Sequence, residues 1–318
     1  MKVLITGGCG FIGSNFIRYF IKEHPDFKII NLDKLTYAGN LKNLKDIEKN
    51  KNYKFIKGDI CNLELVKKLA KTCDFIINFA AETHVDRSIK SSYEFIKTNI
   101  YGVWALLEAT KNTKIKKFIQ ISTDEVYGSI EAGSFIETDS LSPSSPYSAS
   151  KASADLLCNA YFKTYNVPVI IIRSVNNFGP YQYPEKVIPL FITNLLEKKK
   201  IPIYGDGQNI RDWIYVLDNI RAIDFILFKG KIGEIYNVSS GNEISNLDLA
   251  NLILKKLNLD SSFIKYIKDR PGHDIRYSLD SSKLKNLGFK LVYDFEKSLE
   301  ATIDWYKENK SWWKALKS

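Results

Sequence analysis

The sequence predicts an α/β fold in which a doubly wound parallel sheet is followed by a second, smaller domain. Two observations indicate the sheet: short, almost wholly apolar runs alternate with helical segments, and the first of these runs leads into a glycine-rich turn. Apolar strands of this kind are buried on both faces, which requires helices on either side of the sheet. A third observation indicates the smaller domain: after about residue 174 the chain becomes rich in Gly, Pro, Asn and aromatic residues.

The turn after the first strand has the spacing of a dinucleotide-binding motif. Residues 2–6 (KVLIT) read as a strand, and the following GGCGFIG places Gly7, Gly10 and Gly13 ahead of a helix with apolar residues at helical intervals. Such glycines let the backbone approach a pyrophosphate, whose negative charge faces the positive end of the helix. This strand–turn–helix context predicts a Rossmann-type sheet that binds a dinucleotide.

A carboxylate ends the second predicted strand, at residues 27–33. This residue, Asp33, lies twenty positions after Gly13. A carboxylate at that distance accepts a hydrogen bond from the ribose 2′-hydroxyl of the cofactor and repels a 2′-phosphate. The sequence therefore predicts NAD rather than NADP.

The alternation of strands and helices continues toward the middle of the chain. Long helices are expected at about 93–112 and 146–165, and further strands at 53–59, 75–81, 117–123 and 167–174. Small residues at Ala80 and Ala81 leave room for a cofactor at a strand end. Ligands of parallel sheets bind beyond the carboxyl ends of the strands, and we expect the site at that edge.

The stretch from Ser122 to Lys151 carries the candidate chemistry. Tyr147 and Lys151 are four residues apart and share one face of a helix. The lysine charge is expected to lower the pKa of the tyrosine, so that its hydroxyl exchanges protons near neutral pH. Asp124 and Glu125 directly follow a predicted strand. Adjacent carboxylates are tolerated where their environments differ, so that one stays protonated as an acid and the other ionised as a base.

The domain boundaries follow from the change of composition. We expect the dinucleotide-binding domain at residues 1–175, with residues 213–238 returning to it, and a smaller, interleaved substrate-binding domain at 176–318. In the later part we expect an amphipathic helix at 216–228, a loop with two arginines and a histidine at 269–277, and one capped helix at 294–313.

Composition argues against several other classes of protein. The 318 residues include 46 Lys and Arg against 36 Asp and Glu, but the lysines are spread along the chain, which argues against a nucleic-acid partner and suits a small anionic ligand. Four scattered cysteines lack the spacing of a zinc site or a disulfide scaffold, so no metal is expected. No run reaches the roughly 18 apolar residues of a membrane span, and the first apolar run is too short for a signal peptide; we expect a cytoplasmic protein without a membrane partner.

Longer motifs resemble the extended short-chain dehydrogenase/reductase superfamily and, within it, the dTDP-glucose 4,6-dehydratases. They run from residue 3 to about 277: TGGCGFIGSNF, LDKLTYAGN, GDICN, AAETHVDRSI, STDEVYG, SPYSASKA, RSVNNFGPYQYPEK, GDGQNIRDWIYVLDN and DRPGHDIRY. Thr123-Asp124-Glu125 is the most specific, because related decarboxylases and GDP-mannose dehydratases typically have Ser in place of Asp124 and epimerases lack the pair. The chain departs from the pattern at Phe178, where relatives often have Tyr.

The resemblance implies a hydro-lyase of deoxysugar biosynthesis that converts dTDP-glucose to dTDP-4-keto-6-deoxyglucose. Tyr147, assisted by Lys151, would take the C4 hydroxyl proton while hydride passes from C4 to NAD, and Thr123 would hold the C4 oxygen. Glu125 would then remove the C5 proton, Asp124 would protonate the departing C6 hydroxyl, and hydride would return to C6. The resemblance also implies a homodimer in which the two long helices pair into a four-helix bundle.

Binding residues are implied by the same matching positions. For NAD they are Gly7, Gly10, Phe11, Ile12, Gly13, Asp33, Lys34, Asp59, Ile60, Ala81, Tyr147, Lys151 and Asn177. For the nucleotide sugar they are Thr83, Thr123, Asn176, Lys186, Arg211, Asn246, Arg270 and His273; the two guanidinium groups suit a diphosphate. Several have structural alternatives: an ion pair with Asp212 or Asp206 for Arg211, a turn cap by Asp274 for His273, and loop capping for Asn176 and Asn177.

Two alternatives to the implied function stay open. The first is a dehydratase or decarboxylase that acts on another nucleotide sugar, such as UDP-glucose. The second is a non-catalytic protein that binds a dinucleotide for regulation; the intact Asp124-Glu125 pair and the Tyr147–Lys151 pair argue against it.

Overall fold

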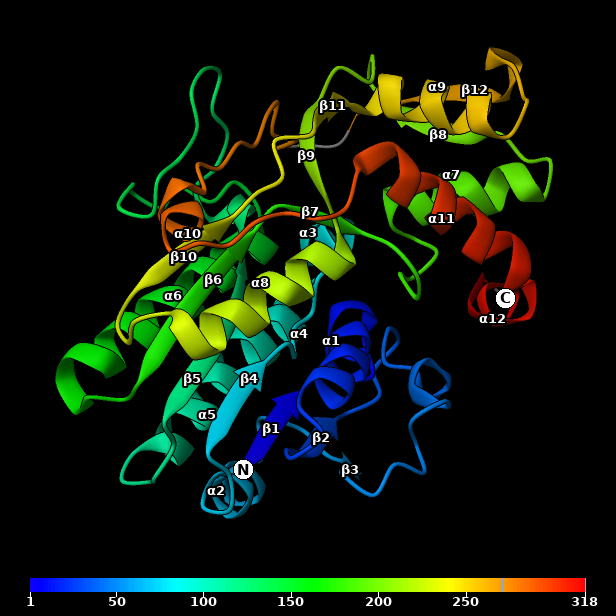
Figure 1. Ribbon diagram of the computed structural model, residues 1–318. Helices are drawn as coiled ribbons and strands as arrows, with labels where there is room; N and C mark the ends of the chain where they lie inside the picture. The colour runs from blue at the N-terminus through cyan, green and yellow to red at the C-terminus, as the bar shows by residue number, and fades with distance from the viewer. Residues whose placement is uncertain (270–271, 318) are drawn as a thin grey trace.

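A seven-stranded parallel sheet forms the centre of the computed structural model, which describes residues 1–269 and 272–317 (Figure 1). Its strands lie in the order β10-β6-β5-β4-β1-β2-β3, and every neighbouring pair is parallel. This confirms the predicted α/β class and doubly wound sheet. The strands are β1 (Lys2–Thr6), β2 (Lys28–Asp33), β3 (Tyr53–Lys57), β4 (Phe75–Asn78), β5 (Lys117–Thr123), β6 (Val169–Ser174) and β10 (Ile235–Val238).

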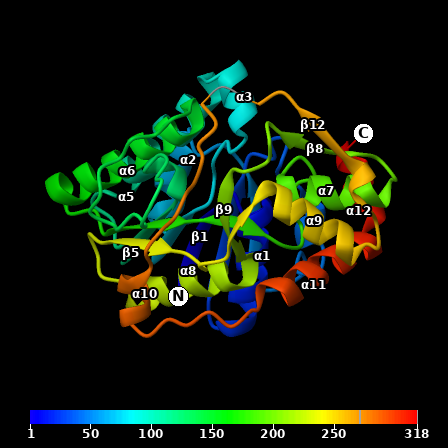
Figure 2. The ribbon, with the colours of Figure 1, turned by 90° about the horizontal axis from the view of Figure 1, so that it is seen from above.

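Helices cover both faces of this sheet because its strands are apolar on both. In β1, Val3 and Ile5 join one buried cluster, whereas Leu4 between them joins the other, as the alternation of side chains along a strand requires. Figure 2 shows the two helical layers on opposite sides of the strands. The first layer holds α1 (Phe11–Glu23) and α8 (Val216–Lys229), and the second holds α2 (Leu63–Ala70), α5 (Val103–Thr110) and α6 (Pro146–Tyr165).

The two long helices differ in regularity. α6 has the predicted bounds: Ser145 and Ser148 cap its start reciprocally, and Asn166 ends it in the left-handed conformation, with φ of 56°. The segment expected as one helix at about 93–112 is instead built from α4 (Tyr93–Phe95), the π-helical η2 (Ile96–Gly102) and α5, after the short α3 (Val85–Lys90).

The later part of the chain adds two small sheets and several helices. One sheet has the order β11-β9-β7 and the other pairs β12 with β8. The strands are β7 (Asn176–Phe178), β8 (Ile201–Tyr204), β9 (Ile210–Tyr215), β11 (Glu243–Ser245) and β12 (Ile264–Ile267). The helices of this later part are α7 (Val187–Leu196), α9 (Asn246–Lys256), α10 (Ser282–Asn286), α11 (Phe295–Glu308) and α12 (Lys310–Lys317), and it also contains the 3-10 turn η4 (Ser261–Phe263). Two further 3-10 turns lie in the first half of the chain: η1 (Leu41–Leu44) and η3 (Asp124–Val126).

The C-terminal helix differs from the prediction of one continuous element. Asp294 caps the start of α11 as expected, but the chain breaks at Asn309 and α12 follows as a separate helix. Trp312 and Trp313 in α12 are both buried, and the break turns both rings inward.

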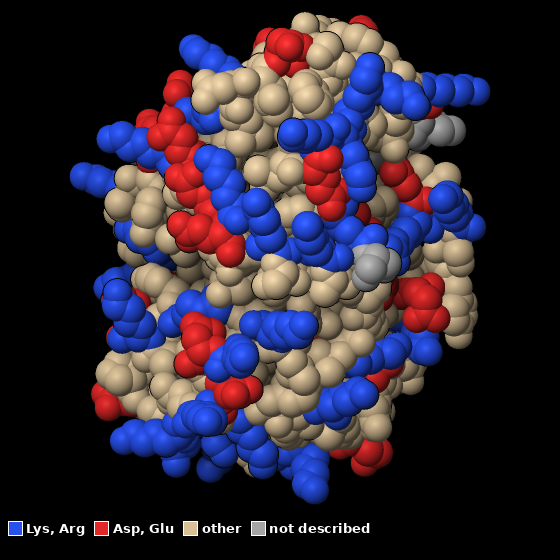
Figure 3. Space-filling model, turned by 90° about the vertical axis from the view of Figure 1, so that its right-hand side faces the viewer, with Lys and Arg blue, Asp and Glu red and all other residues tan. Residues whose placement is uncertain are grey.

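The surface and the helices bear on possible partners. On the face seen in Figure 3, Lys and Arg side chains are interleaved with Asp and Glu rather than gathered into one block. Within the residues that the structure describes, every helix falls short of the length or apolar character that a bilayer crossing needs.

Candidate active site

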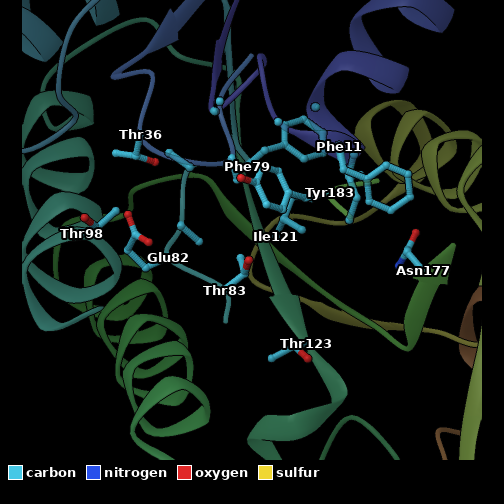
Figure 4. Close-up of a pocket in the computed structure, with 18 of the residues that line it drawn as sticks. Phe11, Thr36, Phe79, Glu82, Thr83, Thr98, Ile121, Thr123, Asn177 and Tyr183 are labelled. Atoms are coloured by element: carbon cyan, nitrogen blue, oxygen red, sulfur yellow. The ribbon is translucent and has the colours of Figure 1, made fainter. Parts of the chain in front are cut away.

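One cavity lies at the carboxyl ends of the central strands, where the fold places ligands. Its walls come from the ends of β1 to β6, from the segments that follow these strands and from α6. The thirteen positions matched to NAD and the five catalytic candidates all line it. Figure 4 shows Glu82 and Thr98 on one side of this cavity and Asn177 on the other, with Thr123 at the end of its strand.

The glycine-rich turn forms a cradle that has no room for side chains. Gly7 has φ of +70°, and a Cβ atom there would lie 2.5 Å from the backbone nitrogen of Ala80. A Cβ atom at Gly13 would lie 2.5 Å from the carbonyl oxygen of Gly7. The backbone of the turn can therefore face a ligand directly at the start of α1, which fits the pyrophosphate of a dinucleotide.

Asp33 stands at the end of β2 beside this turn. One of its carboxylate oxygens accepts a hydrogen bond from the backbone N–H of Cys9 and the other from that of Leu35, both at 2.8 Å. Burial raises the pKa of this carboxyl group, and the two N–H donors act in the opposite direction. At the next strand end, the Lys34 ammonium lies 2.9 Å from a carboxylate oxygen of Asp59.

The acid pair follows β5 in the short turn η3. Thr123 donates its hydroxyl hydrogen to Oδ1 of Asp124 at 3.0 Å and accepts from the backbone N–H of Glu125 at 3.3 Å. Asp124 is only 2% exposed, and its Oδ2 has no hydrogen-bond partner among the described residues. Burial, followed by the nearby Glu125, raises the pKa of Asp124 to about 8. Asp124 is therefore protonated at neutral pH, as one member of the pair must be if it is to act as an acid.

Tyr147 differs from the prediction that the lysine would lower its pKa. Its pKa lies well above the usual value because the hydroxyl is buried and because Glu125 and Asp124 are near; the Thr123 hydroxyl acts in the opposite direction. Spacing on the helix correctly placed Tyr147 and Lys151 in one cavity, but it could not show that burial of the hydroxyl would be the largest effect on the tyrosine pKa.

The Lys151 ammonium is held by the end of β5. It donates a hydrogen bond to the carbonyl oxygen of Ile121 at 2.6 Å. Burial lowers its pKa, while Asp155, one helical turn further along α6, raises it. Asp155 in turn pairs with the guanidinium of Arg173 at 2.8 Å, and both side chains are buried. The Lys151 ammonium is thus held by the Ile121 carbonyl of the sheet and interacts with the buried Asp155 of its own helix.

Four of the residues matched to the nucleotide sugar line the cavity: Thr83, Thr123, Asn176 and Lys186. The Lys186 ammonium donates to the carbonyl oxygen of Thr83 at 2.9 Å. Asn176 and Asn177 each have a buried side-chain oxygen without a hydrogen-bond partner in the described parts of the chain. These two oxygens can accept hydrogen bonds from a ligand. Loop capping alone therefore does not explain the two side chains, because it would leave both oxygens without a partner.

Arg211 stands in β9 and is not among the residues that line that cavity, although its charge acts on the buried Asp124. It is 6% exposed, and its guanidinium donates to the carbonyl oxygens of Ile210 at 2.7 Å and Asp274 at 2.9 Å and stacks on the ring of Tyr277 at 4.3 Å. The partners of the guanidinium are thus backbone carbonyls and an aromatic ring, and not the carboxylates of Asp212 or Asp206 that the alternative interpretation named.

Asn246 and His273 are also outside the cavity wall. Asn246 is the first residue of α9, and its backbone N–H donates to the carbonyl of Asn209. His273 pairs through Nδ1 with Asp269 at 2.7 Å rather than with Asp274. Arg270 lies outside the described residues.

Several residues of the cavity wall were not singled out from the sequence. Tyr37, Glu82, Thr98, Tyr183 and Glu185 all line it. Tyr37 and Glu185 meet through Arg87, whose guanidinium lies 3.8 Å from the Tyr37 ring centre and 3.0 Å from Glu185 Oε2. Four of them lie in motifs beside predicted site residues: Tyr37 in LDKLTYAGN, Glu82 in AAETHVDRSI, and Tyr183 and Glu185 in RSVNNFGPYQYPEK. Thr98 lies in none of these motifs.

Comparisons with known proteins agree with this geometry. The family model described as GDP-mannose 4,6 dehydratase matches residues 4–302. The low-salt glycan biosynthesis protein Agl12 of Haloferax volcanii is 49% identical over 96% of this chain and 98% of its own length. The dTDP-glucose 4,6-dehydratase of Streptomyces niveus is 46% identical over 100% of this chain and 96% of its own.

A solved structure gives the same picture. The crystal structure of DesIV, a dTDP-glucose 4,6-dehydratase from Streptomyces venezuelae with NAD bound, matches with a TM-score of 0.98 at 44% identity. The match covers 99% of this chain and 100% of that one.

Proposed function

The chain belongs to the GDP-mannose 4,6-dehydratase family of the extended short-chain dehydrogenases/reductases, and we propose that it catalyses the NAD-dependent dehydration of dTDP-glucose to dTDP-4-keto-6-deoxyglucose. The observation that carries this is one cavity that combines a buried, protonated Asp124 next to Glu125 with the Tyr147–Lys151 pair and a dinucleotide cradle. The relatives named as dTDP-glucose 4,6-dehydratases support the choice of sugar nucleotide.

The residues present fit NAD. The cradle of Gly7, Gly10 and Gly13 would hold its pyrophosphate, Asp33 would accept from its ribose, and the remaining matched positions would line its path. When bound, NAD supplies the hydride acceptor for C4 of the sugar, the positive charge of its oxidised ring and the hydride donor for C6.

The first proton transfer falls to Tyr147. It takes the proton of the C4 hydroxyl, while the Thr123 hydroxyl holds the C4 oxygen. The raised pKa of Tyr147 makes its phenolate a strong base once formed, and positive charge within the closed site favours that form. Lys151, fixed on the carbonyl of Ile121, contributes such charge from the side of the sheet.

The elimination falls to the acid pair. Once C4 is a ketone, the proton on C5 is acidic, and Glu125 removes it. Asp124, protonated because its pKa is about 8, gives its proton to the hydroxyl that leaves C6. The C6–O bond breaks, water is released and a C5–C6 double bond forms, so the two carboxyl groups act in opposite senses in one step.

We propose the same division into domains as the sequence suggests, at residues 1–175 with 213–238, and 176–318. It is supported by α8 and β10, which belong to the layers of the large sheet although β7, β8 and β9, which precede them in the chain, belong to the small sheets. A cytoplasmic location is a further proposal, supported by the free thiols of the four cysteines, all within the described residues.

A homodimer is proposed from exposed apolar side chains on the two long helical segments. Tyr93 is 66% exposed, Ile96 53% and Leu156 61%, although they are large and apolar. Patches of this kind mark interfaces, and a second copy would pair these segments into a bundle. Light scattering at micromolar concentration should give twice the chain mass; a monomer would contradict the proposal.

The function is tested by presenting dTDP-glucose, UDP-glucose and GDP-mannose side by side to the purified protein, without added reductant. We expect dTDP-glucose to be converted fastest, with the 4-keto product detected by its absorbance in alkali. Preferential conversion of UDP-glucose would move the proposal to the alternative substrate, and no 4-keto product from any of the three would overturn it.

A further inference from the structure

The C-terminal helix reaches the glycine-rich turn through a single pair of side chains. The indole N–H of Trp312, in α12, donates to Oδ1 of Asn43, in η1, at 2.9 Å. The Nδ2 group of Asn43 donates onward to the carbonyl oxygen of Cys9 at 2.9 Å. Cys9 lies inside the turn GGCGFIG, so hydrogen bonds connect α12, η1 and this turn.

The peptide of Cys9 is held from both sides. Its carbonyl also accepts from the backbone N–H of Asn40 at 3.0 Å, and its own N–H donates to Asp33 at 2.8 Å. Asn43 is 1% exposed, so its amide cannot exchange these partners for water. The geometry of the turn therefore depends on which way that amide faces.

Trp312 and the Cys9 carbonyl together fix that orientation. A carboxamide has an acceptor oxygen and a donor nitrogen of nearly the same shape, and it can face either way. An indole N–H is only a donor and can pair only with the oxygen, which leaves Nδ2 directed at Cys9. In the reversed orientation, Oδ1 would face the Cys9 carbonyl and two acceptors would repel each other.

We propose that Trp312 is a positioning residue for the dinucleotide site: by orienting the amide of Asn43, it keeps the glycine-rich turn in the shape that binds the cofactor. The proposal rests on the NAD site of the proposed function and adds to it a dependence on a helix outside the Rossmann-type sheet. Without the indole donor, the turn samples other shapes and NAD leaves faster.

A second contact ties the same helix to the cavity. The carbonyl of Leu316 accepts from the hydroxyl of Tyr183 at 3.2 Å, and Tyr183 lines the cavity. The Trp312 ring also packs edge-on against Tyr181, another residue of the wall, with 5.9 Å between ring centres. Among the described residues, α12 therefore contacts two residues of the cavity wall, Tyr181 and Tyr183, and reaches the turn through Asn43.

The test compares Trp312→Phe with Trp313→Phe. Trp313 is the neighbouring residue, is 1% exposed and donates its indole N–H to the carbonyl of Tyr306 at 2.8 Å, within the C-terminal helices. Each variant loses one buried indole hydrogen bond, but only the first loses a contact with η1. The protein is purified with its bound NAD and mixed with isotopically labelled NAD. Exchange is followed by mass spectrometry of the dinucleotide released on denaturation.

We expect Trp312→Phe to exchange NAD about threefold to tenfold faster than wild type, the effect of one hydrogen bond, and Trp313→Phe to stay within about twofold. The thermal unfolding midpoints should fall by similar amounts in both variants. Equal exchange rates in the two variants would overturn the proposal.

A third variant, Asn43→Asp, keeps an acceptor for Trp312 but removes the donor to Cys9. It should exchange NAD at least as fast as Trp312→Phe, and it decides the question if Trp312→Phe does not fold. Exchange at the wild-type rate in Asn43→Asp would contradict the inference alone. A wild-type protein that binds no NAD would overturn the proposed function as well.

Discussion

The two ends of the proposed site are built by different means. At the sheet end, the catalytic candidates stand at the end of β5, directly after it or near the start of α6, and all of them line one cavity. At the other end, Arg211, Asn246 and His273 come from the small sheet, a helix start and a loop, and none of them lines that cavity. The first end is positioned by the parallel sheet whether or not a ligand is present, whereas the second depends on contacts between loops.

Arg211 shows the difference most clearly. A free guanidinium fork suits a diphosphate, yet here its donors face the carbonyls of Ile210, Asp274 and Ile275. Lys151 also donates to a carbonyl, that of Ile121, but it does so within the cavity wall. The sheet end is therefore arranged for chemistry in this structure, and the diphosphate end would have to exchange internal contacts for ligand contacts.

The largest expected effects lie at the sheet end, where they separate the order of the steps. Tyr147→Phe should lose about 10²–10⁴-fold in rate and form little NADH, because the C4 proton is not removed. Asp124→Asn and Glu125→Gln should still oxidise C4, accumulate NADH and stall before water is lost. Single-turnover mixing, followed by the absorbance of reduced nicotinamide, measures both. Normal elimination in Asp124→Asn, or NADH accumulation in Tyr147→Phe, would contradict the assigned roles.

A second variant tests whether the diphosphate end acts in binding at all. Arg211→Met should raise KM for the nucleotide sugar about 10–100-fold, the range of hydrogen bonds to a charged group, and leave kcat nearly unchanged. Initial rates over a range of dTDP-glucose concentrations measure this. If KM stays constant while the unfolding midpoint falls, Arg211 is a brace for the loop at Asp274 and not a ligand of the diphosphate.

This contrast also explains what the sequence could predict. The ends of β1, β2 and β5 were predicted closely because apolar runs and the glycine turn indicate local structure. A parallel sheet then brings the carboxyl ends of its strands to one edge, where ligands bind. Strand bounds and the start of α6 need no knowledge of distant residues. The placement of Tyr147 beside Thr123 follows from the same rule, since adjacent elements bring both to one edge.

Other features depended on contacts that no local pattern shows. The partner of Lys151 is a backbone carbonyl, and the direction of the Tyr147 pKa depends on burial among carboxylates. Beyond the break at Asn309, the Trp312 indole bonds to Asn43, which lies 269 residues earlier in the chain. The surroundings of Arg211 are set by a loop about sixty residues later, so its charge alone could not place it.

The choice of cofactor gives a third test at the sheet end. Asp33→Asn keeps the shape of the side chain but removes the charge, so binding of NAD should weaken about tenfold and the preference over NADP should shrink. Titration of the cofactor-free protein with each dinucleotide measures this. An unchanged NAD-to-NADP ratio would show that the carboxylate serves only the backbone N–H groups of Cys9 and Leu35.

The smallest expected effect is on stability and concerns the buried acid. The pKa of Asp124 is about 8 in the folded chain against 3.8 as its ordinary value. Between these two pH values the folded protein holds a proton that the unfolded chain has released. Stability from this group is therefore complete below pH 4 and is lost as the pH rises through 8. The acid form needed for elimination disappears above the same pH.

Asp124→Asn removes that titration while keeping the shape of the side chain. Relative to wild type, its unfolding midpoint should be nearly unchanged near pH 4 and higher by roughly 5–10 °C at pH 8. Circular dichroism melts of cofactor-free protein at the two pH values measure the difference. A difference that does not grow with pH would mean that Asp124 is ionised in the folded chain. The sheet end would then hold two charged carboxylates, and the proton for the leaving hydroxyl would have to come from elsewhere.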